Sequence, residues 1–381
     1  MRGADVVIVG GGIAGLGVAH HLARAGAGRV VLLEREPLLA SHATARNAAI
    51  FLPVERDEAS MRLAARQAAL FDELFGDRAW LAPTGALLVA ERAELLADAA
   101  DAARAGGVRC DSVGHDALVA AVPLLRGGRA RHALHLPGSG VLDVHGIVAA
   151  LTASARASGV EVRVVSDVRR LLVERGRVAG VELADGRALA AGAVVIAGGA
   201  WSEEVAASAG LALPLTPLRR HLVWLEAPRD APELGGGPVV WAVDDEVYFR
   251  PESGGVLASP CDEVPHAAGV PPTDPAALDV LARKLGALAP RLVEGGVRRA
   301  WACLRTFAPD RVTVAGADPR APGLTWLAGL GGQGMTLGLA AAEVTAAAVL
   351  GAHHPLASAL GPERLLGQDL KRVAPHSAVT P

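Results

Sequence analysis

The sequence contains few aromatic residues and few cysteines. Aromatic residues make up 3% of the 381 positions, whereas hydrophobic residues as a whole make up 51%, so we expect a mainly aliphatic core. The three cysteines, Cys110, Cys261 and Cys303, are widely spaced and form no C-x-x-C pair. This pattern predicts neither a disulfide framework nor a metal site. It is typical of a protein that works in the reducing cytoplasm.

The sequence also lacks a strong excess of one charge and a long uncharged apolar run. The formal net charge of -3 gives no indication of a nucleic-acid partner. The first residues enter a strand pattern directly, without the apolar segment and cleavage site of a signal peptide. No stretch approaches about 18 apolar residues without glycine breaks, so we predict no membrane span. These absences favour a cytoplasmic protein with a small-molecule partner.

The segment "ADVVIVGGGIAGLGVAHHLARAGAGRVVLLERE" combines a strand, a glycine-rich turn and a helix. The β-branched run from Val6 to Val9 predicts a buried parallel strand. Residues 13–25 are expected to form a helix closed by Gly26. Residues 30–33 predict a second strand that ends in Glu34.

The glycines of this turn have the spacing G-x-G-x-x-G, and an acid follows them after about 20 residues. We expect Gly10 to make a tight turn, Gly12 to admit a pyrophosphate, and Gly15 to let helix and strand pack closely. The amino terminus of the helix offers N–H groups and a partial positive charge to the phosphates. Glu34 is suited to accept hydrogen bonds from a ribose diol. A glycine-rich turn without a ligand is the structural alternative.

Two further segments go beyond what a bare NAD domain needs. "GRVAGVELADGRALAAGAVVIAGGAWSEEVA" predicts a hairpin with a turn at Asp185-Gly186, and then a buried strand that leads to Gly198 and Trp201. "GLTWLAGLGGQGMTLGLAAAEVTAAAVLG" predicts a strand, a glycine-rich turn and a long helix. The amino terminus of that helix is suited to the electron-rich pyrimidine end of a flavin. A packed terminal helix after a tight turn is the alternative. Taken together, the segments favour FAD.

The chain resembles the FAD-dependent D-amino-acid dehydrogenase and oxidase family, which includes glycine and sarcosine oxidases. The resemblance covers nearly the whole length and is closest to the D-amino-acid dehydrogenases, through His42 and the "YFRP" motif. It rests on "VVIVGGGIAGLGVAHHLARAG", "LLEREPLLASHATARNAAI", "VVIAGGAWS", "DEVYFRPESGGVLASP", "CLRTFAPDRVTVAG" and "WLAGLGGQGMTLGLAAAE". It implies an α/β fold with a Rossmann-like FAD-binding domain and a second, sheet-based substrate domain.

The implied domains are discontinuous. The FAD-binding domain would comprise residues 1–80, 143–215 and 300–381, and the substrate-binding domain residues 81–142 and 216–299. The tail "KRVAPHSAVTP" is expected to be a frayed end.

The resemblance also assigns residues to the cofactor. It places them in the first glycine turn with its acid, in the loop around residue 45, near the second strand turn and in the last glycine-rich turn. The implied residues are Gly10, Gly12, Ile13, Ala14, Gly15, Glu34, Arg35, Ala43, Thr44, Arg46, Asn47, Ala48, Val168, Gly198, Trp201, Gly331, Gly332, Gln333, Gly334, Met335 and Thr336. Some sarcosine-oxidase-like members bind flavin covalently through a cysteine at the position of Cys303, but we favour non-covalent FAD and a small buried thiol.

Substrate binding is implied for five residues: Arg305, Tyr248, Arg220, His42 and Gln333. A guanidinium matches a carboxylate with two parallel hydrogen bonds, so Arg305 is expected to hold the substrate carboxylate. The alternatives are a structural ion pair for Arg305, a core aromatic for Tyr248, a solvated charge for Arg220 and a simple loop residue for His42.

The implied reaction is oxidative deamination of a D-amino acid. Hydride would pass from Cα to flavin N5, and water would convert the imine to a 2-oxo acid and ammonia. The same arginine would serve an oxidase of glycine, N-methyl amino acids or 2-hydroxy acids, and a non-catalytic flavoprotein scaffold is a further alternative. No second dinucleotide fingerprint is present, so we expect oxygen or a quinone, not NAD, as electron acceptor.

A preference for small or apolar side chains is also expected. A cationic side chain would need a buried acid in the pocket. The predicted strand "LAPTGALLVA" contains none, and Asp244, Asp245 and Glu246 are interpreted as a hairpin turn.

Overall fold

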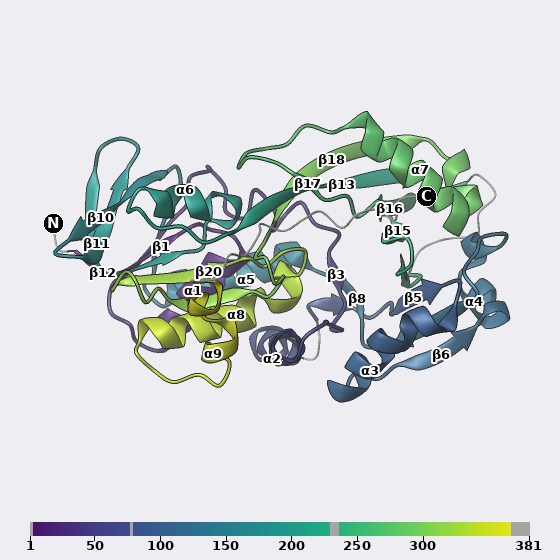
Figure 1. The fold of residues 1–381 in the computed structure, drawn as a ribbon, viewed down its shortest axis with the longest axis horizontal. Helices are drawn as coiled ribbons and strands as arrows, with labels where there is room; N and C mark the ends of the chain where they lie inside the picture. The colour runs from purple at the N-terminus through teal and green to yellow at the C-terminus, as the bar shows by residue number, and fades with distance from the viewer. Residues whose placement is uncertain (1–2, 77–78, 229–235, 367–381) are drawn as a thin grey trace.

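The computed structural model describes residues 3–76, 79–228 and 236–366 and contains two large sheets (Figure 1). An eight-stranded sheet with its helices lies at the left of the view, and a nine-stranded sheet lies at the right. A small third sheet joins β3 (Ile50–Phe51), β8 (Gly140–Leu142) and β4 (Leu81–Ala82). The predicted frayed tail, residues 371–381, lies outside the described residues.

The eight-stranded sheet has the order β10-β11-β12-β1-β2-β9, with β20 beside β12 and β19 beside β20. β1 is parallel to both β2 and β12, and β20 is parallel to β12. The predicted hairpin at Asp185-Gly186 is confirmed by the antiparallel pair β11 and β12. The strands are β1 (Ala4–Val9), β2 (Val30–Leu33), β9 (Glu161–Arg163), β10 (Val168–Glu174), β11 (Arg177–Leu183), β12 (Ala188–Ile196), β19 (Val314–Ala317) and β20 (Leu324–Ala328).

Helices cover this sheet and complete its core. β1 sends Val6 and Ile8 into a cluster with α1 (Ile13–Arg24) and α8 (Gly334–Val349), while Val7 and Val9 point into a second cluster on the other face. Both clusters are mainly aliphatic, as the composition predicts. α1 and α8 pack so closely that a Cβ atom on Gly17 would lie 2.8 Å from that of Ala342. The other helices near this sheet are α2 (Glu58–Phe75), α5 (Val144–Ala157), α6 (Ser202–Ala207) and α9 (Ala357–Leu360).

The nine-stranded sheet has the order β17-β13-β16-β15-β14-β5-β7-β6, with β18 also paired to β13. One face packs in an apolar cluster with α7 (Pro275–Leu288) and α4 (His115–Ala121). α3 (Ala97–Ala105) lies beside β5 in a separate cluster. The strands are β5 (Ala86–Ala90), β6 (Asp111–Gly114), β7 (His132–Leu136), β13 (Thr216–Glu226), β14 (Val239–Ala242), β15 (Val247–Glu252), β16 (Gly255–Ser259), β17 (Val264–Pro265) and β18 (Val297–Phe307).

The position of β18 differs from the division of the chain that the sequence suggested. That division assigned residue 300 onward to the FAD-binding domain, but β18 pairs along its whole length with β13 of the nine-stranded sheet. Only after Phe307 does the chain return to the other sheet, through β19. The remaining predicted domain boundaries stay predictions.

Candidate active site

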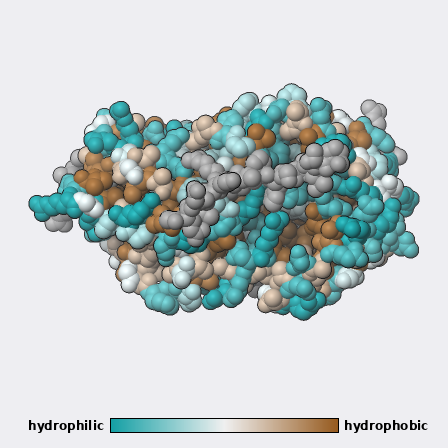
Figure 2. All heavy atoms as spheres, in the orientation of Figure 1, coloured by the Kyte–Doolittle hydropathy of each residue, from teal (hydrophilic) through white to brown (hydrophobic). Residues whose placement is uncertain are grey.

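A large cavity of about 1450 Å³ opens between the two sheets. It is lined by both glycine-rich turns, by the loop around residue 45 and by one face of the nine-stranded sheet. Figure 2 shows apolar residues gathered in a hollow of the surface, in the part of the view where β5 and β15 lie in Figure 1. All the predicted site residues line this cavity except Gly15 and Thr336, which lie behind its wall.

The first glycine turn has the geometry that its spacing predicts. Gly10 has a φ of +110°, and a Cβ atom there would lie 2.5 Å from the carbonyl oxygen of Ala197. A Cβ atom on Gly15 would lie 1.9 Å from the Gly10 carbonyl oxygen, so Gly15 serves the close contact of helix and strand. The N–H groups of Gly12 and Ala14 find no acceptor in the described part of the chain. This end of α1 is therefore open to an anion.

The buried acid after β2 supports this turn. The Glu34 carboxylate accepts hydrogen bonds from the N–H groups of Gly11, at 2.7 Å, and Glu36, at 2.8 Å. Its two oxygens keep further lone pairs for a ligand hydroxyl. The Arg35 guanidinium lies 4.9 Å from the ring centre of Trp201, and Gly198 and Val168 line the cavity nearby.

His42 belongs to this end of the cavity and not to the substrate end. Its Nε2 atom lies 2.9 Å from the Glu36 carboxylate, and its ring packs 4.5 Å from that of Trp201. The predicted contact of His42 with the substrate is not supported by these partners, because the hydrogen bond and the ring contact hold it beside Glu36 and Trp201.

The loop that follows His42 connects the two ends of the cavity. Thr44 Oγ1 accepts a hydrogen bond from the Ile13 N–H at 3.1 Å, and Asn47 donates to the Thr44 carbonyl oxygen at 2.6 Å. The carbonyl oxygens of Arg46 and Ala48 accept hydrogen bonds from the nine-stranded sheet. Ala43 also lines the cavity.

The second glycine-rich turn leads into α8 at the opposite wall. Gly331 has a φ of +53°, and a Cβ atom there would lie 2.5 Å from the Phe307 ring. Gly332, Gln333, Gly334 and Met335 line the cavity, as predicted from the sequence. Thr336 is buried in the first turn of α8, where its N–H donates to the Gln333 carbonyl oxygen.

Strand register gathers the predicted substrate residues on one face of the nine-stranded sheet. Arg220 is paired with Cys303, which shares its face with Arg305 two residues later. Tyr248 is paired with Trp241, which is paired in turn with Leu88. All six side chains line the cavity.

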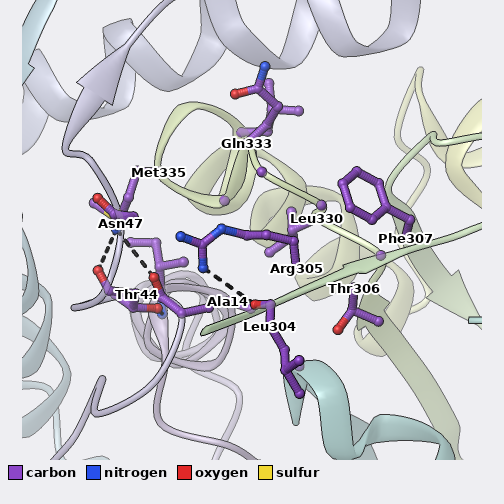
Figure 3. A pocket seen from close by; sticks show the side chains of 18 of the residues that line it. Ala14, Thr44, Asn47, Leu304, Arg305, Thr306, Phe307, Leu330, Gln333 and Met335 are labelled. Carbon is purple, nitrogen blue, oxygen red and sulfur yellow. Dashed lines mark hydrogen bonds between the residues drawn. The ribbon is translucent and has the colours of Figure 1, made fainter. Parts of the chain in front are cut away.

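Arg305 is a buried cation whose partners among the described residues are all uncharged. Its side chain lies between the loop with Asn47 and the turn with Leu330, and the residue is only 5% exposed (Figure 3). It donates to the Cys303 thiol at 2.6 Å and to the carbonyl oxygens of Leu304, at 3.4 Å, and Arg46, at 3.0 Å. In the described part of the chain it forms no ion pair with an acid. An arginine in this setting calls for an anionic ligand.

Tyr248 and Cys261 stay protonated beside this arginine. Burial, assisted by the neighbouring Cys261, raises the pKa of Tyr248 to about 12, although Arg220 and Arg305 oppose the shift. Burial also raises the pKa of Cys261 to about 11. The Tyr248 hydroxyl is therefore available as a hydrogen-bond donor at neutral pH.

Sequence reasoning missed several charged residues of the cavity. Glu55 lies just before α2, and its Oε1 atom is buried without a hydrogen-bond partner among the described residues. Burial, assisted by Asp57, raises the pKa of Glu55 to about 8, against a hydrogen bond with Gln333 and the charge of Arg56. Glu246 lines the cavity 4.0 Å from Arg56 and is not merely part of a turn. No local motif marks these positions.

Glu263 and Arg311 were missed as well. Glu263 binds both Arg220 and Arg311, so Arg220 is neither solvated nor without a partner. The segment "CDEVP" lies beside β13, a strand that lines the cavity. Only the pairing of β17 with β13 reveals this position.

The cavity fits a dinucleotide cofactor such as FAD. It has free N–H donors at the end of α1, an acid at the end of β2 and a second helix terminus at Gly334, and all of these line it. Among residues 3–76, 79–228 and 236–366, no three His, Cys, Asp or Glu side chains gather as metal ligands. In the same residues, no helix combines the length and the apolar character that crossing a membrane requires.

Curated relatives match most of the chain. A D-amino acid dehydrogenase from Cereibacter sphaeroides is 34% identical over 295 residues, which cover 73% of this chain and 63% of that protein. A 4-methylaminobutanoate oxidase (formaldehyde-forming) from Paenarthrobacter nicotinovorans is 28% identical over 348 residues, which cover 86% of this chain and 41% of that protein. The chain thus spans less than two thirds of the length of both relatives.

Solved structures share the fold. Iminodiacetate oxidase from a Chelativorans species is 26% identical with a TM-score of 0.78, over 94% of this chain and 98% of that one. L-proline dehydrogenase from P. horikoshii is 23% identical with a TM-score of 0.85, over 95% and 98% of the two chains, and this likeness shows the fold. The family model described as FAD dependent oxidoreductase matches residues 5–348. The chain therefore belongs to the FAD dependent oxidoreductase family and is an FAD-dependent enzyme.

Proposed function

We propose that the protein oxidatively deaminates a D-amino acid whose carboxylate is held by Arg305. The observation that carries this proposal is the buried guanidinium of Arg305, which has no acid partner in the described part of the chain. A carboxylate would supply the missing charge and accept two hydrogen bonds. The configuration is supported by the 34% identity to a D-amino acid dehydrogenase.

The side chains of the cavity bind and orient the substrate. Arg305 fixes the carboxylate end, and the protonated hydroxyl of Tyr248 adds a donor on the same sheet face. The turn at Gly331–Gly334 forms the facing wall. When bound, FAD supplies the acceptor for the hydride that leaves Cα. The residues of the chain act by holding Cα in one orientation and by excluding water.

Small or apolar side chains are proposed to be favoured over cationic ones. The predicted strand "LAPTGALLVA" contains no acid, but Glu55, Glu246 and Glu263 line the cavity from other segments. Their charges are nevertheless offset: Arg56 lies beside Glu246, and two arginines bind Glu263. Glu55 has a pKa of about 8 and is mostly uncharged at pH 7. A cationic side chain would therefore meet Arg220 and Arg305 without a free carboxylate.

The test is anaerobic bleaching of the bound flavin by a panel of D-amino acids, followed by admission of air. We expect D-alanine, D-leucine or D-methionine to bleach it with higher kcat/KM than D-arginine or D-lysine. A higher kcat/KM for D-arginine would contradict the side-chain preference. Failure of every amino acid to bleach the flavin would contradict the proposed function. Rapid recolouring by air identifies oxygen as acceptor, whereas recolouring only by a quinone identifies a dehydrogenase.

Secondary amines and 2-hydroxy acids form the alternative substrate class. Arg305 would bind their carboxylates equally well, and the relatives include 4-methylaminobutanoate oxidase and iminodiacetate oxidase. Sarcosine, glycine and a 2-hydroxy acid therefore belong in the same panel. Because the family model that matches residues 5–348 is described as FAD dependent oxidoreductase, a non-catalytic scaffold is not proposed.

The flavin is proposed to be held without a covalent bond. The Cys303 thiol is engaged by the Arg46 carbonyl oxygen and by Arg305, at 3.1 and 2.6 Å. Acid precipitation of the holoprotein should leave a colourless pellet and a yellow supernatant, and a yellow pellet would contradict this.

The three cysteines are unpaired, which supports a reducing, cytoplasmic setting.

A further inference from the structure

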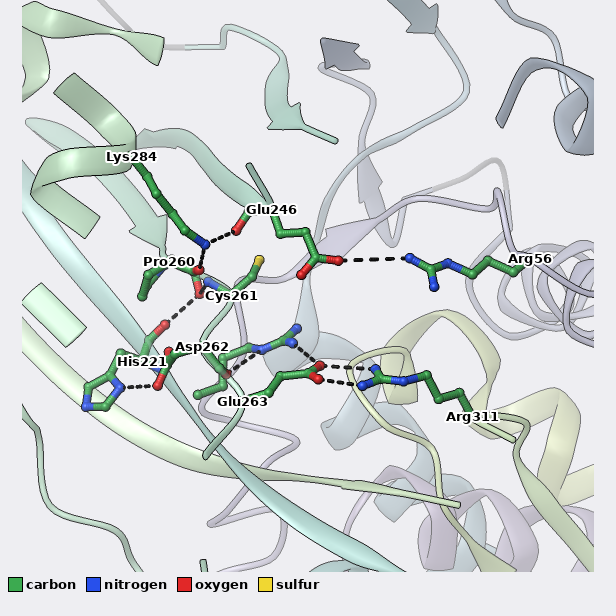
Figure 4. Close-up of polar contacts among 11 residues, drawn as sticks. Arg56, His221, Glu246, Pro260, Cys261, Asp262, Glu263, Lys284 and Arg311 are labelled. Carbon is green, nitrogen blue, oxygen red and sulfur yellow. Dashed lines mark hydrogen bonds and ion pairs between the residues drawn. The ribbon is translucent and has the colours of Figure 1, made fainter. Parts of the chain in front are cut away.

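A buried carboxylate holds two arginines at the wall of the cavity. The Glu263 side chain is 4% exposed, and its Oε1 atom accepts from Arg220 Nη2 at 2.7 Å and from Arg311 Nη1 at 3.1 Å. Its Oε2 atom accepts from Arg311 Nη2 at 2.5 Å. Figure 4 shows the Arg311 guanidinium reaching the Glu263 carboxylate, with Asp262 beside it.

Glu263 is itself held in place by the residues that precede it. The Asp262 carboxylate accepts from the backbone N–H of His221 at 2.7 Å and lies 2.7 Å from His221 Nδ1. The fully buried His221 accepts the Asp274 N–H at Nε2, at 2.9 Å, and its Nδ1 atom faces the Asp262 carboxylate. Ser259 donates to the His221 carbonyl oxygen at 2.7 Å. Residues 259–263 are thus anchored to β13 at several points.

The two arginines come from different segments but border the same turn. Arg220 lies on β13, and its Nη1 atom would be 3.5 Å from a Cβ atom on Gly332. Arg311 lies in the loop after β18, and its guanidinium lies 4.6 Å from the ring centre of Phe307, which packs against Gly331. Glu263 therefore ties β13 to this loop beside the second glycine-rich turn.

The contacts of Arg220 leave one edge of its guanidinium unused. Nη2 donates to Glu263, and Nε donates weakly to the Asp262 carbonyl oxygen at 3.5 Å. Nη1 finds no acceptor in the described part of the chain and lies at the cavity wall. Arg220 and Arg311 carry two positive charges, one more than the single negative charge of the Glu263 carboxylate. Without Glu263 they would repel each other, and Arg220 would lose the contact that sets its orientation.

We propose that Glu263 is a positioning residue of the substrate cavity, which holds Arg220 with its Nη1 edge presented to a carboxylate of the substrate. This inference rests on the proposed function only in taking the ligand to be an amino acid. That carboxylate is either the one that Arg305 holds or a second one on the side chain. The two sources share one chemistry, and the substrates of the test separate them.

The test compares the holoproteins of Glu263→Gln, Glu263→Asp and a matched control, Glu343→Gln. Glu343 binds Arg66 with two hydrogen bonds of 2.7 and 2.8 Å between α8 and α2, and neither residue lines the cavity. Loss of a group that orients a metal ligand typically costs about 10- to 100-fold in affinity or activity, and we take the same scale for a group that orients a binding arginine. We therefore expect KM of Glu263→Gln to rise by about this factor while kcat changes much less. Glu263→Asp should recover part of the loss, and Glu343→Gln should keep KM near the wild-type value.

The substrate arms are D-alanine, D-aspartate and D-asparagine. An equal rise of KM for all three assigns Arg220 to the common carboxylate. A rise confined to D-aspartate assigns it to a side-chain carboxylate. Both results support the positioning role. Wild-type KM values in Glu263→Gln, or a KM rise matched by Glu343→Gln, would overturn it, as would loss of FAD without a change in carboxylate affinity.

A binding measurement separates this inference from the proposed function. Acetate is titrated into the oxidised holoproteins, and its Kd is read from the flavin spectrum. A Kd that rises about 10-fold or more in Glu263→Gln but not in Glu343→Gln supports the inference even if no amino acid reduces the flavin. If amino acids do reduce the wild type but the Kd is unchanged in Glu263→Gln, the proposed function stands and the inference fails.

Discussion

The two ends of the cavity are built in opposite ways. At the first glycine turn, the groups that face the cavity are backbone N–H groups of one short segment, and several positions require the absence of a side chain. At the sheet face, the groups that face the cavity are side chains such as Arg305, Arg220 and Tyr248, which lie on different strands. A substitution that adds atoms should therefore impair binding at the glycine turn, whereas a substitution that removes atoms should impair binding at the sheet face. Each prediction below tests this contrast.

The largest effect is expected when atoms are added at Gly12. A Cβ atom there would meet only Thr44 Oγ1, at 3.1 Å, and the backbone angles of φ -80° and ψ -173° suit any residue. The chain itself can accommodate the change, but the valine methyl groups of Gly12→Val would occupy the approach of the pyrophosphate. The purified variant should be folded and colourless. A yellow variant with full flavin content would refute the assignment.

Gly15→Val is the companion variant. Its Cβ atom would lie 1.9 Å from the Gly10 carbonyl oxygen, which belongs to the turn itself. This variant should lose thermal stability together with flavin, unlike Gly12→Val. The comparison of apoprotein melting temperatures separates an obstructed ligand from a distorted turn.

The same contrast explains what could be predicted from the sequence. The β1–α1–β2 unit is contiguous, so the spacing of Gly10, Gly12 and Gly15 and the acid at Glu34 sufficed to locate it. The bounds of β2 were predicted correctly, and those of α1 to within one residue. Arg305 was identified by resemblance, because its motif in "CLRTFAPDRVTVAG" is also contiguous.

The features that could not be predicted from the sequence depend on strand register. Glu263 lies 43 residues from Arg220 and 48 from Arg311, and no periodicity predicts that they meet. The membership of β18 in the nine-stranded sheet could not be predicted for the same reason, since only its pairing with β13 reveals it. Glu55 follows an apolar stretch, and no local pattern marks its Oε1 atom as buried.

The second prediction removes atoms at the sheet face. Arg305→Ala would leave the substrate carboxylate without its buried partner, which typically costs about 2–5 kcal/mol. Because 1.4 kcal/mol corresponds to about tenfold, kcat/KM should fall roughly 30-fold to several thousand-fold. Arg305→Lys keeps the charge but loses the fork, so it should recover only part of the loss. Flavin content should stay normal in both, because the first glycine turn is unchanged.

A carboxylate-free amine with the same side chain serves as the control for Arg305. It should be a poor substrate of the wild type, and Arg305→Ala should change its turnover little. Near wild-type kcat/KM of Arg305→Ala with the best amino acid would contradict carboxylate binding. An equal loss for the amine and the amino acid would assign Arg305 a structural role.

The smallest effect is expected where one atom is exchanged, in Glu55→Gln. Burial raises the pKa of Glu55 from 4.5 to about 8, so the folded state binds this proton more tightly than the unfolded state. Between these two pH values the unfolded carboxyl is ionised while the folded one is protonated, and the contribution of Glu55 to stability falls as pH rises. Above about pH 8 both states are charged and the fall ends. Glutamine has no such proton, so the stability of Glu55→Gln relative to that of the wild type should increase across this pH window.

Melting temperatures of the two holoproteins between pH 4.5 and 9 measure this gain. The difference in melting temperature, Glu55→Gln minus wild type, should increase with pH by roughly 1 °C for each kcal/mol of charge burial that is relieved in a chain of this length, and should level off above about pH 8. Glu58→Gln is the matched control, because the Glu58 side chain is 88% exposed in the first turn of α2. Parallel curves for wild type and Glu55→Gln would show that Glu55 ionises freely. The cavity would then hold an uncompensated carboxylate, and the argument against cationic substrates would lose its basis.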